Sequence, residues 1–182
     1  MLNENEVKRV SKFMSFVLRH DPDCIGIAVD ANGWAEVDEL ISCANAGGRA
    51  LTREIVDEVV ERNDKKRFVL SEDGLRIRAA QGHSIEVDLQ LEPREPPEIL
   101  FHGTTQHYVE SILASGLNPG SRRHVHLSPE EETARKVGSR HGKPSVLRIR
   151  AGEMWKAGYV FYLSENGVWL TDEVPPEFIE RA

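Results

Sequence analysis

Cysteine is scarce in this chain of 182 residues: Cys24 and Cys43 are the only two, and they do not form a C-x-x-C pair. Two thiols alone cannot complete a zinc site or provide the disulfide framework of a small secreted domain. No apolar run approaches the ~20 residues that span a bilayer. Residues 1–6 are polar and acidic, whereas a secretory leader is basic and then apolar. We therefore expect a soluble cytoplasmic protein that does not enter a membrane.

The sequence also lacks the common motifs for nucleotide binding and hydrolysis. It contains no G-x-G-x-x-G after a strand, no G-x-x-x-x-G-K-[ST], no serine-hydrolase elbow and no H-E-x-x-H. A Rossmann-type dinucleotide site, a P-loop and a zinc-protease centre are therefore not supported.

Positive charge is not in excess either, because 23 Lys and Arg residues stand against 30 Asp and Glu residues, a net charge of −7. Proteins that coat nucleic acid by charge alone are basic, so the sequence argues against that class. Electrostatic focusing is local, however, and an acidic protein can still hold a single phosphate where a few cations converge.

Proline is concentrated in one segment, where Pro93, Pro96 and Pro97 fall within five positions. This density excludes a helix interior and a central strand, so we interpret residues 91–98 as an extended linker. The linker separates two lobes, residues 1–90 and residues 99–182.

The two lobes have different patterns of predicted elements. The first has helices followed by a hairpin, and the second has many short strands around few helices, so the predicted fold class is α+β with a mainly antiparallel sheet in the second lobe. In the first lobe we expect a helix ending near residues 19–20, a short strand at 25–29, a helix at 37–46, a helix after the N-cap Thr52, and a hairpin of 67–70 with 75–79. In the second lobe we expect strands at 99–102, 125–127, 146–149, 159–163 and 167–170, and helices at 106–114 and, after the cap Ser128, at 129–137.

Two groups of polar residues stand out in the first lobe. Arg19 and His20 end the first helix, where a guanidinium beside an imidazole suits a phosphoryl group. The alternative is that they only interact with the helix dipole. The second group is a basic stretch around the hairpin, which is either a ligand-binding edge or a solvated charged face; its members are Lys65, Lys66, Arg67, Arg76, Arg78, Gln81, His83 and Ser84.

Two further groups lie in the second lobe. His102, Gly103 and Thr104 end a predicted strand, where the ring and the hydroxyl would hold a ribose and the glycine would let the backbone approach a dinucleotide. A packed core histidine is the alternative. In the second group, Arg122 and Arg123 precede three side chains that share one strand face, and the members of that face are His124, His126 and Ser128. His102, His124 and His126 could nominally bind zinc, but two adjacent arginines would repel it, so we expect no metal.

Taken together in chain order, these segments resemble the RNA 2′-phosphotransferase family over nearly the whole chain. No single segment is decisive, but the ordered set is specific. The segments that carry the resemblance are 15–20, 33–35, 63–68, 77–84, 102–104, 116–117, 122–128, 140–142 and 167–171.

The resemblance implies a winged-helix-like N-terminal lobe, a C-terminal lobe with the ADP-ribosyltransferase fold, and NAD as a co-substrate bound to the second lobe. The RNA 2′-phosphate would lie between the lobes. The Arg-His-Arg-Arg set of the family falls on Arg19, His20, Arg67 and Arg122, with Arg123 as the alternative for the last position. The implied NAD-binding residues are His102, Gly103, Thr104, His126, Ser128, Arg140, Gly167 and Val168. Weaker contacts to RNA phosphate are assigned to Arg123, Gln81, His83 and Ser84.

The implied reaction has two steps. The RNA 2′-phosphate attacks the ribose carbon that bears nicotinamide, and the ribose 2″-hydroxyl then attacks the phosphorus, which yields RNA with a 2′-hydroxyl and ADP-ribose 1″,2″-cyclic phosphate. Many ADP-ribosyltransferases have a catalytic glutamate where this chain has Val168. A phosphate nucleophile is already anionic and needs charge neutralisation and alignment rather than a general base.

The resemblance also suggests the partner, an RNA with a 2′-phosphate such as a tRNA after splicing, bound by a monomer. Two alternatives stay open at this point. One is an ADP-ribosyltransferase that acts on a terminal phosphate of nucleic acid, and the other is a non-catalytic winged-helix regulator that senses NAD or ADP-ribose.

Overall fold

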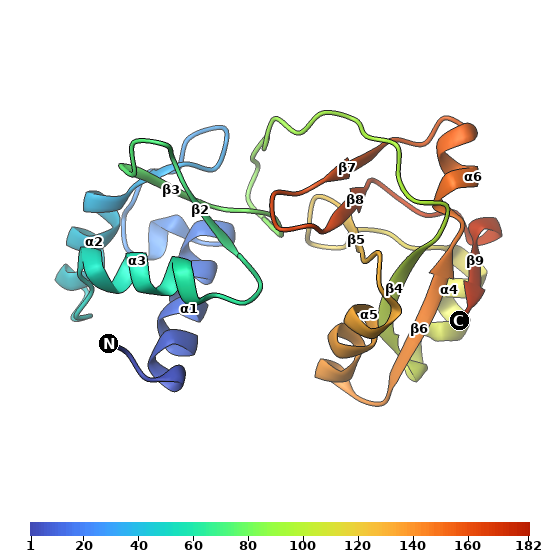
Figure 1. Ribbon diagram of the computed structural model, residues 1–182, viewed down its shortest axis with the longest axis horizontal. Helices are drawn as coiled ribbons and strands as arrows, with labels where there is room; N and C mark the ends of the chain where they lie inside the picture. The colour runs from blue at the N-terminus through green and yellow to red at the C-terminus, as the bar shows by residue number, and fades with distance from the viewer. The chain divides into compact units, whose positions relative to one another are not determined.

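The computed structural model describes residues 1–182, and the chain divides into two compact units, Met1–Gln90 and Leu91–Ala182. Each unit combines helices with antiparallel sheets, so the α+β fold class is confirmed (Figure 1). No helix combines the length and the apolar character that a membrane span requires.

The first unit contains three α-helices and one antiparallel sheet with the strand order β1-β3-β2. Its elements are α1 Glu4–Arg19, the 3-10 turn η1 Pro22–Cys24, β1 Ala35–Glu36, α2 Val37–Ala46, α3 Arg53–Arg62, β2 Phe68–Leu70 and β3 Arg76–Ala79. The predicted hairpin is confirmed, because Phe68 pairs with Ala79 and Leu70 pairs with Ile77.

Local capping explains where these helices begin. In α1, the Asn3 side chain accepts a hydrogen bond from the backbone N of Glu6 at 3.0 Å, and the Glu6 carboxylate accepts one from the backbone N of Asn3 at 2.8 Å. In α3, the hydroxyl of Thr52 accepts from the backbone N of Ile55, so the predicted N-cap is confirmed. The buried faces of all three helices meet the sheet in one apolar cluster, which includes Met14, Leu18, Leu40, Val56, Val59, Phe68 and Ile77.

The strand predicted at residues 25–29 is wrong, because this segment pairs with no other strand. Ile27 is buried, which accounts for the apolar alternation in the sequence. The backbone hydrogen bonds are made elsewhere: the N of Ile27 donates to the carbonyl of Pro22, and the N of Ala28 donates to the Glu39 carboxylate. The extended pairing begins only at β1, which joins β3.

The second unit has two three-stranded antiparallel sheets with the orders β4-β6-β9 and β5-β8-β7. Its elements are β4 Leu100–Thr105, α4 Gln106–Ser115, β5 Val125–Leu127, α5 Glu131–Gly138, the 3-10 turn η2 Ser139–His141, β6 Pro144–Ile149, α6 Ala151–Lys156, β7 Phe161–Leu163, β8 Trp169–Thr171, the 3-10 turn η3 Pro176–Phe178 and β9 Ile179–Arg181. The two sheets meet where Phe101 and Ser128 exchange backbone hydrogen bonds of 2.8 Å.

The proline-rich segment is attached to this second unit. The backbone N of Arg94 donates to the carbonyl of Phe161 at 2.8 Å, and the carbonyl of Glu98 accepts from the backbone N of Gly152 at 3.0 Å. The segment has no helix or ladder of its own until β4 begins, as its prolines require.

Helix α5 packs directly on the backbone of β4. A Cβ atom added to Gly103 would lie 1.7 Å from the carbonyl O of Ala134, and one added to Gly138 would lie 2.4 Å from the carbonyl O of Thr104. Glycines at both positions therefore allow a backbone-to-backbone contact that fixes α5, and the turn η2 after it, against the strand. This helix begins two residues later than predicted. Its N-cap is Glu130, and the predicted cap Ser128 instead forms a side-chain turn with the backbone of Glu130.

Candidate functional site

The candidate residues of the first unit gather where α1 ends. Asp21 and Pro22 stop the helix, since a residue before proline avoids the helical conformation. The chain returns to this point after β3, where the backbone N atoms of Ser84 and Ile85 both donate to the carbonyl of Arg19, at 2.9 and 3.2 Å. Segment 81–85 is thus held against the last turn of α1.

This contact positions two side chains that the sequence singled out. The Nδ1 atom of His20 lies 2.8 Å from the hydroxyl of Ser84. A hydrogen bond there holds the ring orientation and directs the opposite nitrogen, Nε2, away from Ser84. Gly82 has a φ of +87°, and a Cβ atom there would lie 3.6 Å from the Arg19 guanidinium. The glycine is needed for its backbone conformation, and it brings the chain alongside the guanidinium.

Arg67 follows a turn that is anchored to α1. The Asn63 side chain is buried, and it donates from Nδ2 to the hydroxyl of Ser11 at 2.9 Å while its Oδ1 accepts from the backbone N of Lys65 at 3.1 Å. Lys66 takes a φ of +42°, which is uncommon for a residue with a side chain. The carbonyl of Arg67 accepts from the backbone N of Ala80, so the turn leads directly into the hairpin.

The other residues of this basic stretch have different surroundings. The guanidinium of Arg78 lies 4.5 Å from the ring centroid of Trp34 and that of Arg76 lies 5.4 Å from it, both within cation–π range. His83 is only 3% exposed and packs against Gly33, so it supports the fold of segment 81–85. The Oε1 atom of Gln81 is buried without a hydrogen-bond partner.

In the second unit, His102 lies at the junction of the two sheets. Its Nδ1 atom lies 3.2 Å from the carbonyl O of His126. That carbonyl faces β4, because Ser128, two residues further along, exchanges its backbone hydrogen bonds with β4. A carbonyl can only accept, so Nδ1 of His102 carries the proton. Burial lowers the pKa of His102, which keeps the ring neutral and leaves Nε2 as a hydrogen-bond acceptor.

The His126 side chain lies beside Arg122. Nη1 of Arg122 lies 3.1 Å from Nδ1 of His126. A guanidinium has no acceptor, so Nδ1 of His126 accepts and the neutral ring carries its proton on Nε2. Partial desolvation and the positive charge of Arg140 lower the pKa of Arg122, and Arg140 lies on η2, directly after α5. Neither arginine forms an ion pair with a carboxylate, so their charges remain available to an anion.

His124 belongs to different surroundings from His126. Val125 and Leu127 are buried, so His124 and His126 follow the predicted alternation along β5. Burial lowers the pKa of His124, with its Nε2 atom 3.7 Å from Asp172 and with Arg123 nearby. No cluster of three His, Cys, Asp or Glu side chains that could hold a metal ion is present. Arg123 thus lies near His124, whereas Arg122 lies beside His126.

The remaining predicted cofactor residues are positioned by turns. Gly167 has a φ of +81° in the tight connection of β7 to β8, where the hydroxyl of Ser164 accepts from the backbone N of Val168 at 3.0 Å. Thr104 pairs with Ser145 in the β4–β6 ladder. Glycine is required at position 103 for a reason that the sequence did not suggest. The absence of a side chain makes room for α5, and not for a ligand, on that face of the strand.

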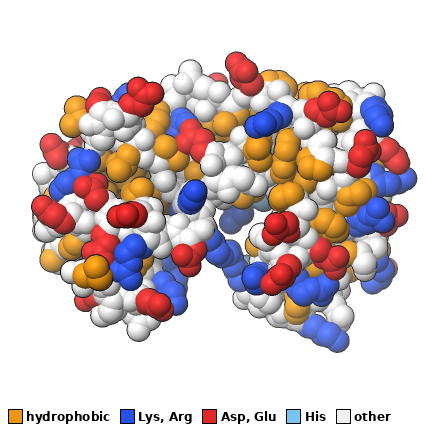
Figure 2. All heavy atoms as spheres, in the orientation of Figure 1, with side chains coloured by type: hydrophobic (Ala, Val, Ile, Leu, Met, Phe, Trp, Pro, Cys, Tyr) orange, Lys and Arg blue, Asp and Glu red, His pale blue; other side chains and the backbone are white.

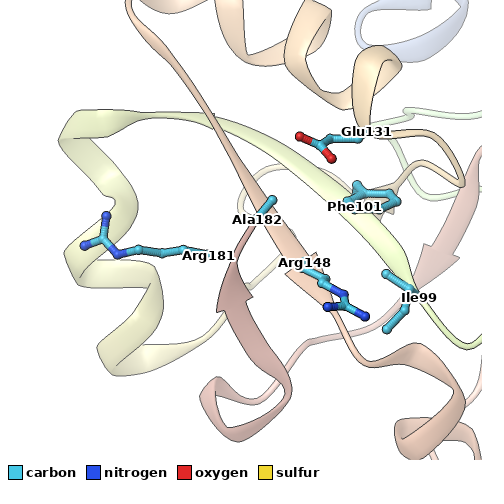
Figure 3. Close-up of a pocket in the computed structure, with 6 residues that line it drawn as sticks. All are labelled: Ile99, Phe101, Glu131, Arg148, Arg181 and Ala182. Carbon is cyan, nitrogen blue, oxygen red and sulfur yellow. The ribbon is translucent and has the colours of Figure 1, made fainter.

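A pocket of about 370 Å³ lies elsewhere on this unit (Figure 3). Successive side chains leave a strand on opposite faces, so its residue Phe101 and the candidate His102 lie on opposite faces of β4. Both arginines that line the pocket form ion pairs, Arg148 with Glu180 and Arg181 with Glu110. The pocket contains none of the predicted site residues; it is lined by Ile99, Phe101, Glu131, Arg148, Arg181 and Ala182.

Sequence reasoning missed several residues that build these groups. Asn63 and Ser11 anchor the turn before Arg67, although no local pattern pairs residues so far apart in the chain. Gly138 was also missed. Its only relation to a predicted site residue in the sequence is that it lies two positions before Arg140. The proximity of Arg140 to Arg122 depends on the packing of α5 on β4 and has no counterpart in the local sequence.

Comparison with known proteins gives one consistent result. A family model described as RNA 2′-phosphotransferase, Tpt1/KptA family, matches residues 4–173. A protein of Flavobacterium johnsoniae named probable RNA 2′-phosphotransferase is 56% identical over 179 residues, which cover 98% of each chain. Proteins with the same name from Acaryochloris marina and Shigella boydii are 57% and 52% identical, and each match covers more than nine-tenths of both chains.

Proposed function

Because this chain belongs to the RNA 2′-phosphotransferase family and is therefore a transferase, we propose that it removes a 2′-phosphate from RNA in two steps, with NAD as the co-substrate. In the first step, a 2′-phosphate oxygen bonds to C1″ of the nicotinamide ribose, and nicotinamide leaves with the electron pair of the broken bond. In the second step, the ribose 2″-hydroxyl oxygen bonds to phosphorus, the bond to the RNA 2′ oxygen breaks, and that oxygen receives the hydroxyl proton.

The observation that carries this proposal is the proximity of two arginines, Arg122, which lies beside His126, and Arg140. Arg122 and Arg140 are close enough to influence each other electrostatically, and neither forms an ion pair with a carboxylate. Two guanidinium groups without acidic partners suit a phosphate or a diphosphate. His102 adds a neutral acceptor at Nε2, which suits a ribose hydroxyl. The residues present therefore fit NAD, whose ribose supplies the electrophilic carbon for the first step.

The residues of the first unit are assigned to the RNA phosphate. Arg19, His20 and Arg67 would bind the 2′-phosphate and stabilise the charge that develops on it when the 2″-hydroxyl attacks. Ser84 would orient His20 so that Nε2 faces the phosphate. Thr104, Ser128, Gly167 and Val168 remain assigned to NAD, and Gly103 allows α5 to pack against β4.

The proposal extends to the fold of each unit and to the cell compartment. Three helices packed on a small antiparallel sheet support a winged-helix-like first unit, and two antiparallel sheets that meet at Phe101 and Ser128 support an ADP-ribosyltransferase-like second unit. The free thiols of Cys24 and Cys43 support a reducing compartment, the cytoplasm.

The experiment is incubation of the purified protein with NAD and a short RNA that carries one internal 2′-monophosphate. We expect release of nicotinamide, loss of the 2′-phosphate and formation of ADP-ribose 1″,2″-cyclic phosphate. Nicotinamide release without loss of the 2′-phosphate would favour an ADP-ribosyltransferase that stops after the first step. No nicotinamide release from a folded protein would refute the proposal and favour a non-catalytic regulator.

Substitutions separate the two steps. Arg19→Ala, His20→Ala and Arg67→Ala should slow the second step more than the first, because charge accumulates on phosphorus only when the 2″-hydroxyl attacks. The ADP-ribosylated RNA should then accumulate and be visible on a denaturing gel with radiolabelled RNA. Loss of activity without any accumulated intermediate would contradict this division of roles.

A further inference from the structure

The exposed face of helix α1 has an unusual composition. At 3.6 residues per turn, the side chains opposite the buried face fall within an arc of about 120°. The residues in this arc are Asn5, Lys8, Arg9, Lys12, Phe16, Arg19 and His20. None of them is acidic, although the chain as a whole has seven more acidic than basic residues. The two acidic residues of the helix, Glu4 and Glu6, lie outside the arc, and Glu6 is engaged in the N-terminal cap.

Three cations of this arc, Lys8, Arg9 and Lys12, form no ion pair, unlike the cations of other charged helices. In α3, Arg53 pairs with Asp57, and Arg62 pairs with Glu58. In α5, both Arg135 and Lys136 pair with glutamates one turn away. On the face drawn in Figure 2, acidic and basic side chains are interspersed.

By contrast, Lys8, Arg9 and Lys12 are exposed and form no ion pair. Their positive charges therefore add to one another instead of being neutralised along the helix. Arg49 adds another positive charge close to this helix, because its guanidinium lies 3.9 Å from the ring centroid of Phe13.

Phe16 makes this face more than a charged surface. Its side chain is 48% exposed, and its ring centroid lies 6.4 Å from that of His20. Phe16 follows Lys12 by one helical turn, and His20 follows Phe16 by another, so the three lie in one row. Cations that follow a backbone, combined with an aromatic ring on which a base can stack, are the combination that binds single-stranded nucleic acid.

We propose that Lys8, Arg9, Lys12 and Phe16 bind the RNA strand that flanks the 2′-phosphate, with the cations on backbone phosphates and the Phe16 ring stacked on a base. The proposal rests on the proposed function, which assigns the 2′-phosphate to Arg19 and His20. The row from Lys8 to His20 is about 18 Å long, which matches roughly five stacked nucleotides at about 3.4 Å each. This surface would bind RNA on one side of the modified nucleotide without reading its sequence.

The test compares two fluorescent RNA probes, each with one internal 2′-phosphate, one of three nucleotides and the other of twelve. Binding is measured by anisotropy at several salt concentrations for the full chain and for the triple variant Lys8→Gln/Arg9→Gln/Lys12→Gln. The matched control, which removes the same charge from exposed helix positions of the second unit, is Arg135→Gln/Lys136→Gln/Lys156→Gln.

For the longer probe, the α1 triple variant should bind more weakly, and its salt slope should fall by about 2, because each lost phosphate contact on a single strand removes about 0.7. Phe16→Ala should weaken binding of this probe at least about fivefold, and Phe16→Trp should retain it. The three-nucleotide probe should bind all these variants as it binds the unmodified chain, and the control triple should match the unmodified chain on both probes.

Two results would overturn the proposal. One is equal binding of the longer probe, with equal salt slopes, by the α1 triple variant and the control triple. The other is an equal loss on both probes, which would place the defect at the 2′-phosphate itself. Turnover is scored separately from binding. If neither probe is turned over while binding of the longer probe still depends on α1, the proposed reaction fails and this RNA-binding surface stands.

Discussion

Replacing Gly103 by alanine should destabilise the second unit, because this glycine allows strand β4 to contact helix α5. The added Cβ would lie 1.7 Å from the carbonyl O of Ala134 and 3.0 Å from the backbone N of Gly138. Nonbonded atoms need well over 3 Å, so the backbone of α5 has to move by at least about 1 Å. No side-chain rotation can relieve this clash, since every nearby atom belongs to the backbone.

The size of the effect follows from the nature of the obstacle. Overpacking a core costs about 1–3 kcal/mol when neighbouring groups can adjust. Here a helix backbone must shift, so we expect about 3 kcal/mol. In a unit of this size, 1 kcal/mol corresponds to about 4–8 °C in Tm, so the transition of the second unit should fall by about 12–24 °C.

The assay is differential scanning calorimetry of the full chain, with Gly152→Ala as the matched control. A Cβ at Gly152 would also lie too close to another group, but that group is the carboxylate of Glu98, whose side chain is 71% exposed and can move away. We expect the control to change the free energy of unfolding by less than about 1 kcal/mol. Gly138→Ala, which faces the carbonyl of Thr104, should resemble Gly103→Ala. If Gly103→Ala and Gly152→Ala unfold at the same temperature, the backbone contact does not have the role assigned to it.

Three further predictions concern single polar side chains. Burial lowers the pKa of His102, so below a pH of about 6.5 the unfolded chain binds a proton at this residue that the folded chain does not bind. The free energy of unfolding, measured with urea, should therefore fall below this pH, and it should fall less in His102→Gln. Ser84→Ala should release the ring of His20, changing the pH dependence of turnover and allowing ADP-ribosylated RNA to accumulate in single-turnover gels, whereas Ser84→Thr should retain both properties. Asn63→Ala should cost about 1–3 kcal/mol in chemical denaturation, and a double-mutant cycle with Ser11→Ala should show coupling; strictly additive effects would argue against the buried hydrogen bond.

The elements with strong local patterns were predictable. The helix predicted at 37–46 coincides with α2, because a continuous apolar stripe precedes two glycines. The hairpin of β2 and β3 was also predictable, since a Gly-containing turn separates two alternating segments. The strand expected at 25–29 was wrong because apolar alternation indicates burial, and burial does not require a strand partner.

The second unit contains elements with little local signal. Helix α6 has six residues, one of them Gly152, and β9 has only three. β9 exists because Ile179 pairs with Ile149 on β6, a contact between segments that are distant in sequence. Local propensity cannot indicate such a strand.

The candidate site was predictable as a set of residue types but not as an arrangement. Arg19 and His20 were candidates because they end the first helix, which Asp21 and Pro22 stop. The sequence left Arg122 and Arg123 as alternatives, and the structure brings Arg122 to His126. The proton positions on His102 and His126 depend on a carbonyl and a guanidinium that approach them in the folded chain, which no sequence pattern reveals.

The two units have separate apolar cores that share no residue, and each completes its own sheets. The boundary between Gln90 and Leu91 is therefore a natural point for recombination. A new N-terminal half could replace the old one in evolution, or in the laboratory as a chimera, without repacking the interior of the C-terminal half. The first unit can then change under selection while the interior of the second unit keeps its packing.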